Sequence, residues 1–357
     1  SFAMAGIINN YIVPGLVYAV IYSIGLFYGS IICLFTLYRG IREKSFDFLK
    51  VKSRPLPPKC LNDPELGEHA YIQIKNIKLH CVEKGDRTKP LMLFLHGFPE
   101  SWYSWRYQIK EFSKDYWTVA VDLRGYGESE RPEGYRYYRL RYLLEDVKNL
   151  IEAFGKEKCI MVGTDWGGVL GWYFLQIYPQ YIDSYVFLNS AHPVTFRKIV
   201  LSSFQQFKKS WYVFFNQLAY LPEMYYRQDD IKVVDKLYET TKNVTPEDIE
   251  AYKFLLGKPG AFIPPVDYYR ANVMPDIELS KRRTTDHPAP RGLFLFGNND
   301  DFIDVRVVEM TKRMYYNLTT EIIQGASHFV QQDEYQTVNR LMREFLKNGY
   351  EERPTSD

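Results

Sequence analysis

Apolar residues follow two patterns along the chain. Residues 11–38 form a run without a charged side chain, whereas from about residue 70 short apolar runs alternate with stretches that have apolar residues at helical spacing. Strands that alternate with helices predict a mostly parallel sheet flanked by helices. The predicted strands are a hairpin over 71–83 and runs at 91–95, 117–121, 159–162, 184–188, 291–296 and 320–323.

The alternation stops between about residues 192 and 285. This segment is rich in aromatic residues and helix-like stretches, and the strand pattern resumes only after it. An insertion at this place predicts a helical cap over the edge where the strands end, and ligands of open α/β sheets bind at that edge. A helix is also predicted over 142–155, and a closing helix follows the last strand.

The apolar run over 11–38 is longer than the roughly 20 residues that cross a bilayer. A signal peptide has a shorter apolar part, and few globular helices are apolar all round, so the run predicts a transmembrane anchor. No basic residue precedes it. Those that follow it most closely are Arg39, Arg42, Lys44, Lys50 and Lys52. By the positive-inside rule, the remainder of the chain lies in the cytosol.

Two glycosylation sequons, at Asn243 and Asn317, point the other way because this modification belongs to the lumen. Such triplets arise often by chance, so the flanking charge is the stronger guide to the orientation of the chain in the membrane. We expect a single-pass protein of the endoplasmic reticulum membrane with a cytosolic catalytic domain. The expected division is a tail with a cloning remnant over 1–10, the anchor over 11–38, a linker and lead-in over 39–69, a core over 70–191 and 286–350, a cap over 192–285 and a tail over 351–357.

Composition adds three points. The 357 residues have a formal net charge of +2, which gives no reason to expect a nucleic-acid partner. The four cysteines form no C-x-x-C pair, so neither a metal site nor a disulfide framework is predicted. Thirty tyrosines are an unusually high number, and each combines an apolar body with a polar tip.

The segment GTDWGG (163–168) directly follows a predicted strand and has the frame of the G-x-S-x-G nucleophile elbow, with Asp165 in place of the serine. Gly163 and Gly167 let the backbone pass closely at such a turn. An aspartate at a strand-to-helix junction also serves as a simple N-cap. Candidate triad residues later in the chain favour the interpretation of Asp165 as the nucleophile.

Those partners are an acid and a histidine in the order of the hydrolase triad. Among the six histidines, only His328 lies in a loop just after the last predicted strand. The acid is expected after the preceding strand, at Asp300 or Asp301, and we favour Asp300 although both suit an ordinary turn. A carboxylate needs no base at pH 7, so His328 is free to activate a water that hydrolyses an ester on Asp165, while the acid orients the ring.

The oxyanion of that ester requires N–H donors. One is expected from Trp166, directly after the nucleophile, and the other from Phe98 in HGFPES (96–101), the loop after an earlier strand. Pro99 is expected to follow a cis peptide bond that shapes this loop. We expect His96 to anchor the loop rather than to take part in the chemistry.

Four segments together carry a resemblance to a known family. They are HGFPESWYSWR (96–106), DLRGYGES (122–129), GTDWGG (163–168) and GASH (325–328). In combination, over roughly residues 70–350, the chain resembles epoxide hydrolases of the α/β-hydrolase fold. With its membrane-anchor pattern it is most similar to the animal group of epoxide hydrolases 3 and 4 or to the invertebrate relatives of that group.

The resemblance implies that two tyrosines of the cap donate protons to the epoxide oxygen. The segment SWYVFF (210–215) is similar to the first tyrosine segment of the family and marks Tyr212. PVDYYRAN (265–272) is similar to the second and marks Tyr269, with Tyr268 as the alternative. Tyrosine suits this role because it stays protonated at pH 7 and is a good donor.

The expected function is opening of a lipophilic epoxide, such as an epoxy fatty acid, by water to a vicinal diol through an ester on Asp165, without a metal or organic cofactor. A haloalkane dehalogenase uses the same Asp, His and acid but needs halide donors in place of the paired tyrosines. A serine esterase is disfavoured because the elbow lacks serine. A membrane-tethered binding protein without activity is a further alternative, which the intact triad opposes.

One residue departs from the family pattern, which has histidine before the nucleophile where this chain has Thr164. We expect the substitution Thr164→His to change the rate or the preference between epoxides without abolishing activity, because the residue is adjacent to the nucleophile and is not itself assigned to the chemistry. The measurement is kcat/KM for two epoxides of different size. Identical kinetics in both proteins would show that the position does not influence the reaction.

Overall fold

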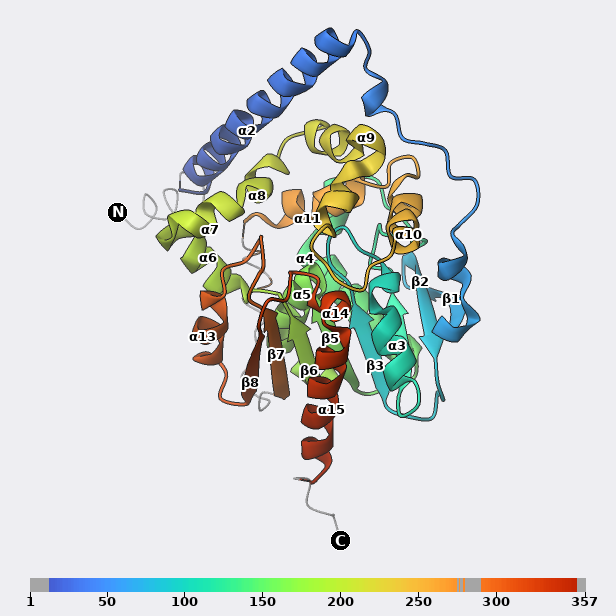
Figure 1. The fold of residues 1–357 in the computed structure, drawn as a ribbon. Helices are drawn as coiled ribbons and strands as arrows, with labels where there is room; N and C mark the ends of the chain where they lie inside the picture. The colour runs from blue at the N-terminus through green and yellow to red at the C-terminus, as the bar shows by residue number, and fades with distance from the viewer. Residues whose placement is uncertain (1–12, 275, 277–278, 280–289, 352–357) are drawn as a thin grey trace, which may run out of the picture.

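The computed structural model describes residues 13–274, 276, 279 and 290–351. Its centre is an eight-stranded sheet in the order β1-β2-β4-β3-β5-β6-β7-β8 (Figure 1). The strands are β1 (Glu68–Ile74), β2 (Ile77–Lys84), β3 (Leu91–Leu95), β4 (Trp117–Val121), β5 (Cys159–Thr164), β6 (Ile182–Leu188), β7 (Arg291–Gly297) and β8 (Leu318–Ile323). β2 runs antiparallel to β1 and β4, and all other neighbouring pairs are parallel. The mostly parallel sheet confirms the predicted fold class.

Both faces of the sheet are buried, which explains why the central strands are continuous apolar runs. Within β3, Leu91, Leu93 and Leu95 belong to one hydrophobic cluster, and Met92 and Phe94 belong to the other. The first cluster includes apolar residues of α4 (Leu140–Ala153), α5 (Asp165–Ile177) and α13 (Arg306–Lys312), and the second includes those of α3 (Arg106–Phe112) and α15 (Tyr335–Glu351). These helices therefore cover opposite faces.

A group of helices lies between β6 and β7, over the edge at which the parallel strands end (Figure 1). They are α6 (Pro193–Ser202), α7 (Phe204–Lys209), α8 (Trp211–Phe215), α9 (Leu221–Leu237), α10 (Pro246–Leu256) and α11 (Ile263–Asn272). We call this group the cap. Its predicted boundary at 285–286 and the predicted tails at 1–10 and beyond Glu351 lie outside the described residues, so the domain division stays a prediction.

The remaining elements lie outside the sheet and cap. α2 (Val13–Glu43) is long and apolar enough to cross a membrane, by length and composition. It lies along the cap and contacts α8 and α9 (Figure 1). Short helices complete the chain: η2 (Asp47–Leu49), η3 (Lys59–Asn62), η4 (Pro64–Leu66), η5 (Trp102–Trp105), η6 (Tyr135–Tyr138), η7 (Pro179–Tyr181) and α14 (Val330–Asp333).

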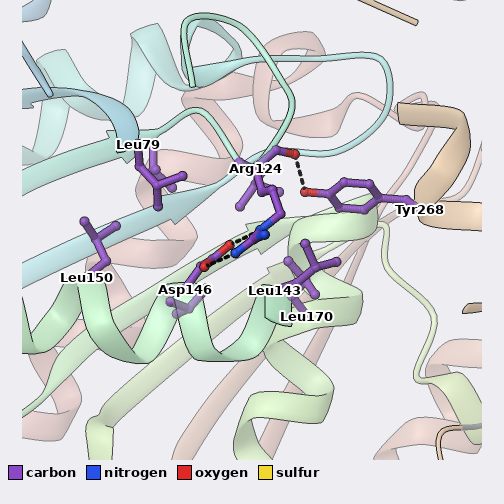
Figure 2. A pocket seen from close by; sticks show the side chains of 10 residues that line it. Leu79, Arg124, Leu143, Asp146, Leu150, Leu170 and Tyr268 are labelled. Atoms are coloured by element: carbon purple, nitrogen blue, oxygen red, sulfur yellow. Dashed lines mark hydrogen bonds and ion pairs between the residues drawn. The ribbon is translucent and has the colours of Figure 1, made fainter. Parts of the chain in front are cut away.

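A buried ion pair of the core lies beside a hydrogen bond that joins the core to the cap. The Arg124 guanidinium, in the loop after β4, donates to both carboxylate oxygens of Asp146 on α4, at 2.6 and 2.7 Å. The carbonyl of Arg124 accepts a hydrogen bond from the hydroxyl of Tyr268 on α11, at 3.0 Å (Figure 2). The adjacent pocket has a volume of about 10 Å³, which leaves room for about one water and no ligand. The apolar side chains labelled around it are Leu79, Leu143, Leu150 and Leu170.

We expect Arg124→Met to lower the free energy of unfolding by about 3 to 5 kcal/mol, because it leaves the buried Asp146 carboxylate without its partner. The double substitution Arg124→Met with Asp146→Leu should recover most of that loss, since no unpaired charge remains. Denaturant titration of the detergent-solubilised protein measures both values. As a control, Arg313→Met in the exposed Arg313–Glu309 pair should cost less than about 1 kcal/mol. A double variant as unstable as the single one would contradict this account.

Candidate active site

Asp165 stands at the turn between β5 and α5. Its φ of 46° lies in the left-handed region, which is unusual for a residue with a side chain. Neighbouring backbone passes so close to this turn that only glycine fits at position 167. A Cβ on Gly167 would lie 2.1 Å from the Leu95 carbonyl oxygen. The turn leaves the Asp165 side chain 17% exposed at the positive end of α5. Thr164, the N-cap of α5, is buried.

His328 and Asp300 meet Asp165 at the same edge of the sheet. His328 follows β8, and its Nε2 lies 3.6 Å from Asp165 Oδ2. Its Nδ1 lies 2.7 Å from Asp300 Oδ2, in the loop after β7. Asp301 is exposed, and the structure places Asp300, not Asp301, against the histidine.

The Asp300 carboxylate is held in place from several directions. Its Oδ1 accepts hydrogen bonds from the backbone N–H groups of Phe302 and Ile303, at 2.7 and 2.9 Å. Its Oδ2 accepts one from Asn189 Nδ2 at 2.8 Å. Burial by itself raises the pKa of Asp300, but His328 and these donors hold it below the usual value. Asn189 had no assigned role from sequence, although it directly follows β6 at the edge where the site forms.

Two carboxylates determine the charge of His328. Burial by itself lowers its pKa, but the nearby Asp300 and Asp165 outweigh burial and raise the pKa of His328 to about 10. The imidazole is therefore cationic at pH 7. The positive ring lies between the two acidic side chains, 2.7 Å from Asp300 Oδ2 and 3.6 Å from Asp165 Oδ2.

The loop after β3 supplies a donor to the nucleophile position. The N–H of Phe98 donates to Asp165 Oδ1 at 2.7 Å, and the Phe98–Pro99 peptide bond is cis. Trp166 lies in the first turn of α5, where backbone N–H groups have no partner within the helix. His96 is buried, accepts from the N–H of Leu123 at 3.1 Å, and its other ring nitrogen lies 2.8 Å from the Gly97 carbonyl oxygen. Both contacts fit a neutral ring that anchors the loop.

The cap brings two tyrosines over the elbow. Tyr212 is on α8 and Tyr269 on α11, and their ring centroids are 5.7 Å apart. The Tyr269 ring also packs against Trp166 at 5.1 Å and Phe98 at 5.7 Å. Burial, followed by the charge of Asp165, raises the pKa of both phenols well above the usual value, so both are protonated. Tyr268, in contrast, donates to the Arg124 carbonyl.

Glu100 is a buried acid of the site that the sequence pattern left without a role. It lies in the same HGFPES segment as Phe98 and is 2% exposed. Its carboxylate accepts hydrogen bonds from the side chains of Gln331 and Gln332, at 2.9 Å each. Burial raises the pKa of Glu100 to about 8.

Within the described residues, no group of three or more His, Cys, Asp or Glu side chains is placed to hold a metal ion. The functional groups that converge at the elbow are instead a carboxylate, an imidazole with its own acid, backbone N–H donors and two protonated phenols. Such a set suits nucleophilic attack by a carboxylate, followed by hydrolysis of the ester that forms.

Comparison with known proteins defines the class first. A family profile described as alpha/beta hydrolase fold matches residues 90–335. The chain is 40% identical over 308 residues to human "Epoxide hydrolase 4", covering 83% of each chain. It is 37% identical over 323 residues to "Epoxide hydrolase 1" of Caenorhabditis elegans, covering 88% of this chain and 78% of the other.

A solved structure agrees with these relatives. The epoxide hydrolase of Bacillus megaterium in complex with an inhibitor superposes with a TM-score of 0.70 at 31% identity, covering 78% of this chain and 100% of the other. The protein is therefore an α/β hydrolase. Within that class, the chain belongs to the epoxide hydrolase family.

The charge arrangement around His328 predicts a change in its pKa. Asp165→Asn removes one of the two carboxylates that favour the imidazolium, so the pKa of His328 should fall from about 10 by about 1 to 3 pH units. Titration of ¹³C-labelled histidine by NMR measures it. Asp301→Asn is the matched control, because Asp301 is exposed and lies away from the ring, and it should leave the pKa unchanged. An unchanged value in Asp165→Asn would refute the assigned cause.

Proposed function

We propose that this enzyme opens lipophilic epoxides to vicinal diols through a covalent ester on Asp165. The observation that carries the proposal is a carboxylate at the nucleophile elbow that faces His328, with the protonated phenols of Tyr212 and Tyr269 nearby on the cap. The two rings are in contact, with centroids 5.7 Å apart, and in the proposed mechanism their hydroxyls face the epoxide oxygen. Within the described residues, neither hydroxyl is engaged by another protein group, unlike that of Tyr268.

In the first step, Asp165 Oδ attacks an epoxide carbon from the side opposite the C–O bond that breaks. A phenol of Tyr212 or Tyr269 gives its proton to the departing oxygen, which becomes a hydroxyl. The product is a hydroxyalkyl ester of Asp165. The phenols contribute because charge develops on the oxygen only as the ring opens, and a donor aimed there stabilises the transition state.

The ester changes the basicity of His328. Alkylation removes the negative charge of Asp165, which is one of the two causes that raise the pKa of the imidazole. His328 then loses its proton more readily. The tyrosinate left by the first step takes up a proton, so the tyrosine is neutral again and the number of protons on the two side chains is unchanged. A neutral His328, oriented by Asp300, is the base that the second step requires.

In the second step, water gives a proton to His328 and attacks the ester carbonyl carbon. The N–H groups of Phe98 and Trp166 stabilise the oxyanion. The C–O bond to the former substrate then breaks, the departing alkoxide takes the proton from His328, and a diol leaves. Asp165 is released as a carboxylic acid with one oxygen that came from water, and it passes its proton to His328, which restores the starting state.

The apolar surroundings support a proposal for the membrane and for the substrate class. We propose that α2 attaches the protein to the endoplasmic reticulum membrane with the catalytic domain on the cytosolic side, because the basic residues after the apolar run are attracted to the anionic cytoplasmic leaflet. An epoxide that partitions into a bilayer, such as one of an unsaturated fatty acid, suits this attachment and the aromatic cap. A haloalkane dehalogenase is the second candidate, since it shares the carboxylate and histidine, but the paired phenols favour an epoxide.

A single turnover in ¹⁸O-water tests the ester route. With enzyme in excess over an epoxy fatty acid, we expect label in the Asp165 peptide and none in the first diol formed, because water attacks the ester carbonyl. Mass spectrometry of peptide and diol provides both readings. Label in the diol but not at Asp165 would mean that water attacks the epoxide directly.

Two variants separate the steps. His328→Gln should accumulate a protein adduct with the mass of the substrate, because the ester forms and is not hydrolysed. Tyr269→Phe should slow the formation of that adduct by about 10²-fold, in keeping with loss of one acid catalyst. If the enzyme released halide from haloalkanes and formed no diol from any epoxide, the proposal would be wrong and the enzyme would be a haloalkane dehalogenase.

A further inference from the structure

The apolar helix α2 has two faces that differ in the size of their side chains. Its buried residues are Gly25, Gly29, Thr36 and Gly40. The opposite side carries large apolar residues, of which Leu16 is 63%, Phe27 63%, Leu34 67% and Ile41 75% exposed. At about 100° per residue, the two sets lie on opposite faces of one helix. A helix that crosses a bilayer alone has no need of such sorting.

The small face is in close contact with the cap. A Cβ added to Gly25 would lie 2.6 Å from the Phe214 carbonyl oxygen, and one added to Gly29 would lie 2.5 Å from the Leu218 side chain. Between these glycines, the Tyr28 ring packs on Trp211 of α8 with centroids 6.0 Å apart. The glycines therefore let the α2 backbone approach the cap as closely as in packed membrane helices.

The contact continues to the end of α2. Thr36 Oγ1 accepts from Gln228 Nε2 at 3.1 Å, and Arg39 donates to both oxygens of Asp229 at 2.6 and 2.7 Å. Asp229 has a φ of 51° and is followed by two more left-handed residues, Asp230 and Ile231, with φ of 60° and 63°. Three such residues in a row are costly, and a bidentate ion pair is one of the contacts that hold them.

A docked α2 and a spanning α2 exclude each other. From Gly25 to Arg39 the docked stretch rises about 21 Å at about 1.5 Å per residue, most of the roughly 30 Å of a hydrocarbon core. A groove of about 790 Å³ between α2 and the cap is lined by Glu223, Arg227 and Arg270. If docked α2 crossed the bilayer, these charged side chains would enter the hydrocarbon at a cost of several kcal/mol.

The cap adds its own apolar residues next to this helix. Leu201 at the end of α6 is 82% exposed and Phe204 at the start of α7 is 76% exposed. Arg197, Lys198 and Lys208 are exposed on the same two helices. α7 leads into α8, which contacts α2 (Figure 1), so these exposed residues lie on the helices that directly precede the contact between α2 and the cap. Apolar residues with basic neighbours are typical of helices that lie in a membrane interface.

We propose that docked α2 and helices α6 and α7 form one surface that lies in a single leaflet of an anionic bilayer. Both ends of α2 then stay on the side of the catalytic domain, and the cap faces the lipid. The inference concerns how the protein is attached and goes beyond the proposed reaction. It holds whether or not the substrate is an epoxide, and its tests require no turnover.

The first test is a chemical cross-link between α2 and the cap in vesicles that contain anionic lipid. In a background with Cys33→Ser and Cys60→Ser, Tyr28→Cys paired with Trp211→Cys should be joined by a short bifunctional maleimide, because the two native rings are in contact, and the cross-linked protein should still float with the vesicles. Leu34→Cys with Trp211→Cys is the control that should not cross-link, because Leu34 lies on the opposite face. Absence of the cross-link in vesicles, with or without its formation in detergent, would overturn the proposal.

The second test probes the cap directly. In the same background, an environment-sensitive dye on Leu201→Cys should shift to shorter emission wavelengths and lose quenching by iodide when vesicles are added. Tyr316→Cys is the matched control, because Tyr316 is 80% exposed and precedes β8, at the opposite edge of the sheet. Its dye should not change. A Leu201 dye that remains as accessible to iodide as the Tyr316 dye would exclude contact of the cap with lipid.

Discussion

The site depends on one imidazole held between two carboxylates. Asp165 and Asp300 are close enough to His328 to raise its pKa to about 10, and the protonated ring in turn lies between both acidic side chains in a largely buried place. This balance is not static during the proposed reaction, because an ester on Asp165 removes one of the charges. The same contact thus favours a cationic ring before the first step and a basic ring after it.

Parallel strands explain how residues so far apart in the chain share this contact. β3, β5, β6, β7 and β8 all end at one edge, so the loops after them bring Phe98, Asp165, Asn189, Asp300 and His328 together. The loops after β3, β5, β6 and β7 begin where a buried strand ends, and the loop with His328 follows the partly exposed edge strand β8. The positions of the groups therefore follow from the sheet, whereas their chemistry follows from individual residues.

The cap closes the site from the other side and is itself tied down at two places. Tyr268 links α11 to the Arg124 carbonyl, beside the buried Arg124–Asp146 pair (Figure 2). Its neighbour Tyr269 packs against Trp166 at the elbow. On the outer side, the small face of α2 packs against α8 and α9. The cap thus carries the two phenols on its inner side and apolar residues on its outer side, so it connects the site to the surface that we propose to face the membrane.

The sequence by itself determined the sheet, the cap insertion, the apolar helix, the elbow at Asp165 and the loop of His328, because burial periodicity, glycine spacing and strand ends are local properties of a chain. Only the tertiary structure decided that Asp300 rather than Asp301 meets the histidine, that Tyr268 binds a carbonyl while Tyr269 faces the nucleophile, and that Asn189 and Glu100 belong to the site. It also decided which face of α2 is covered. Adjacent residues of one type look alike in sequence, and what each side chain contacts depends on distant segments that pack around it.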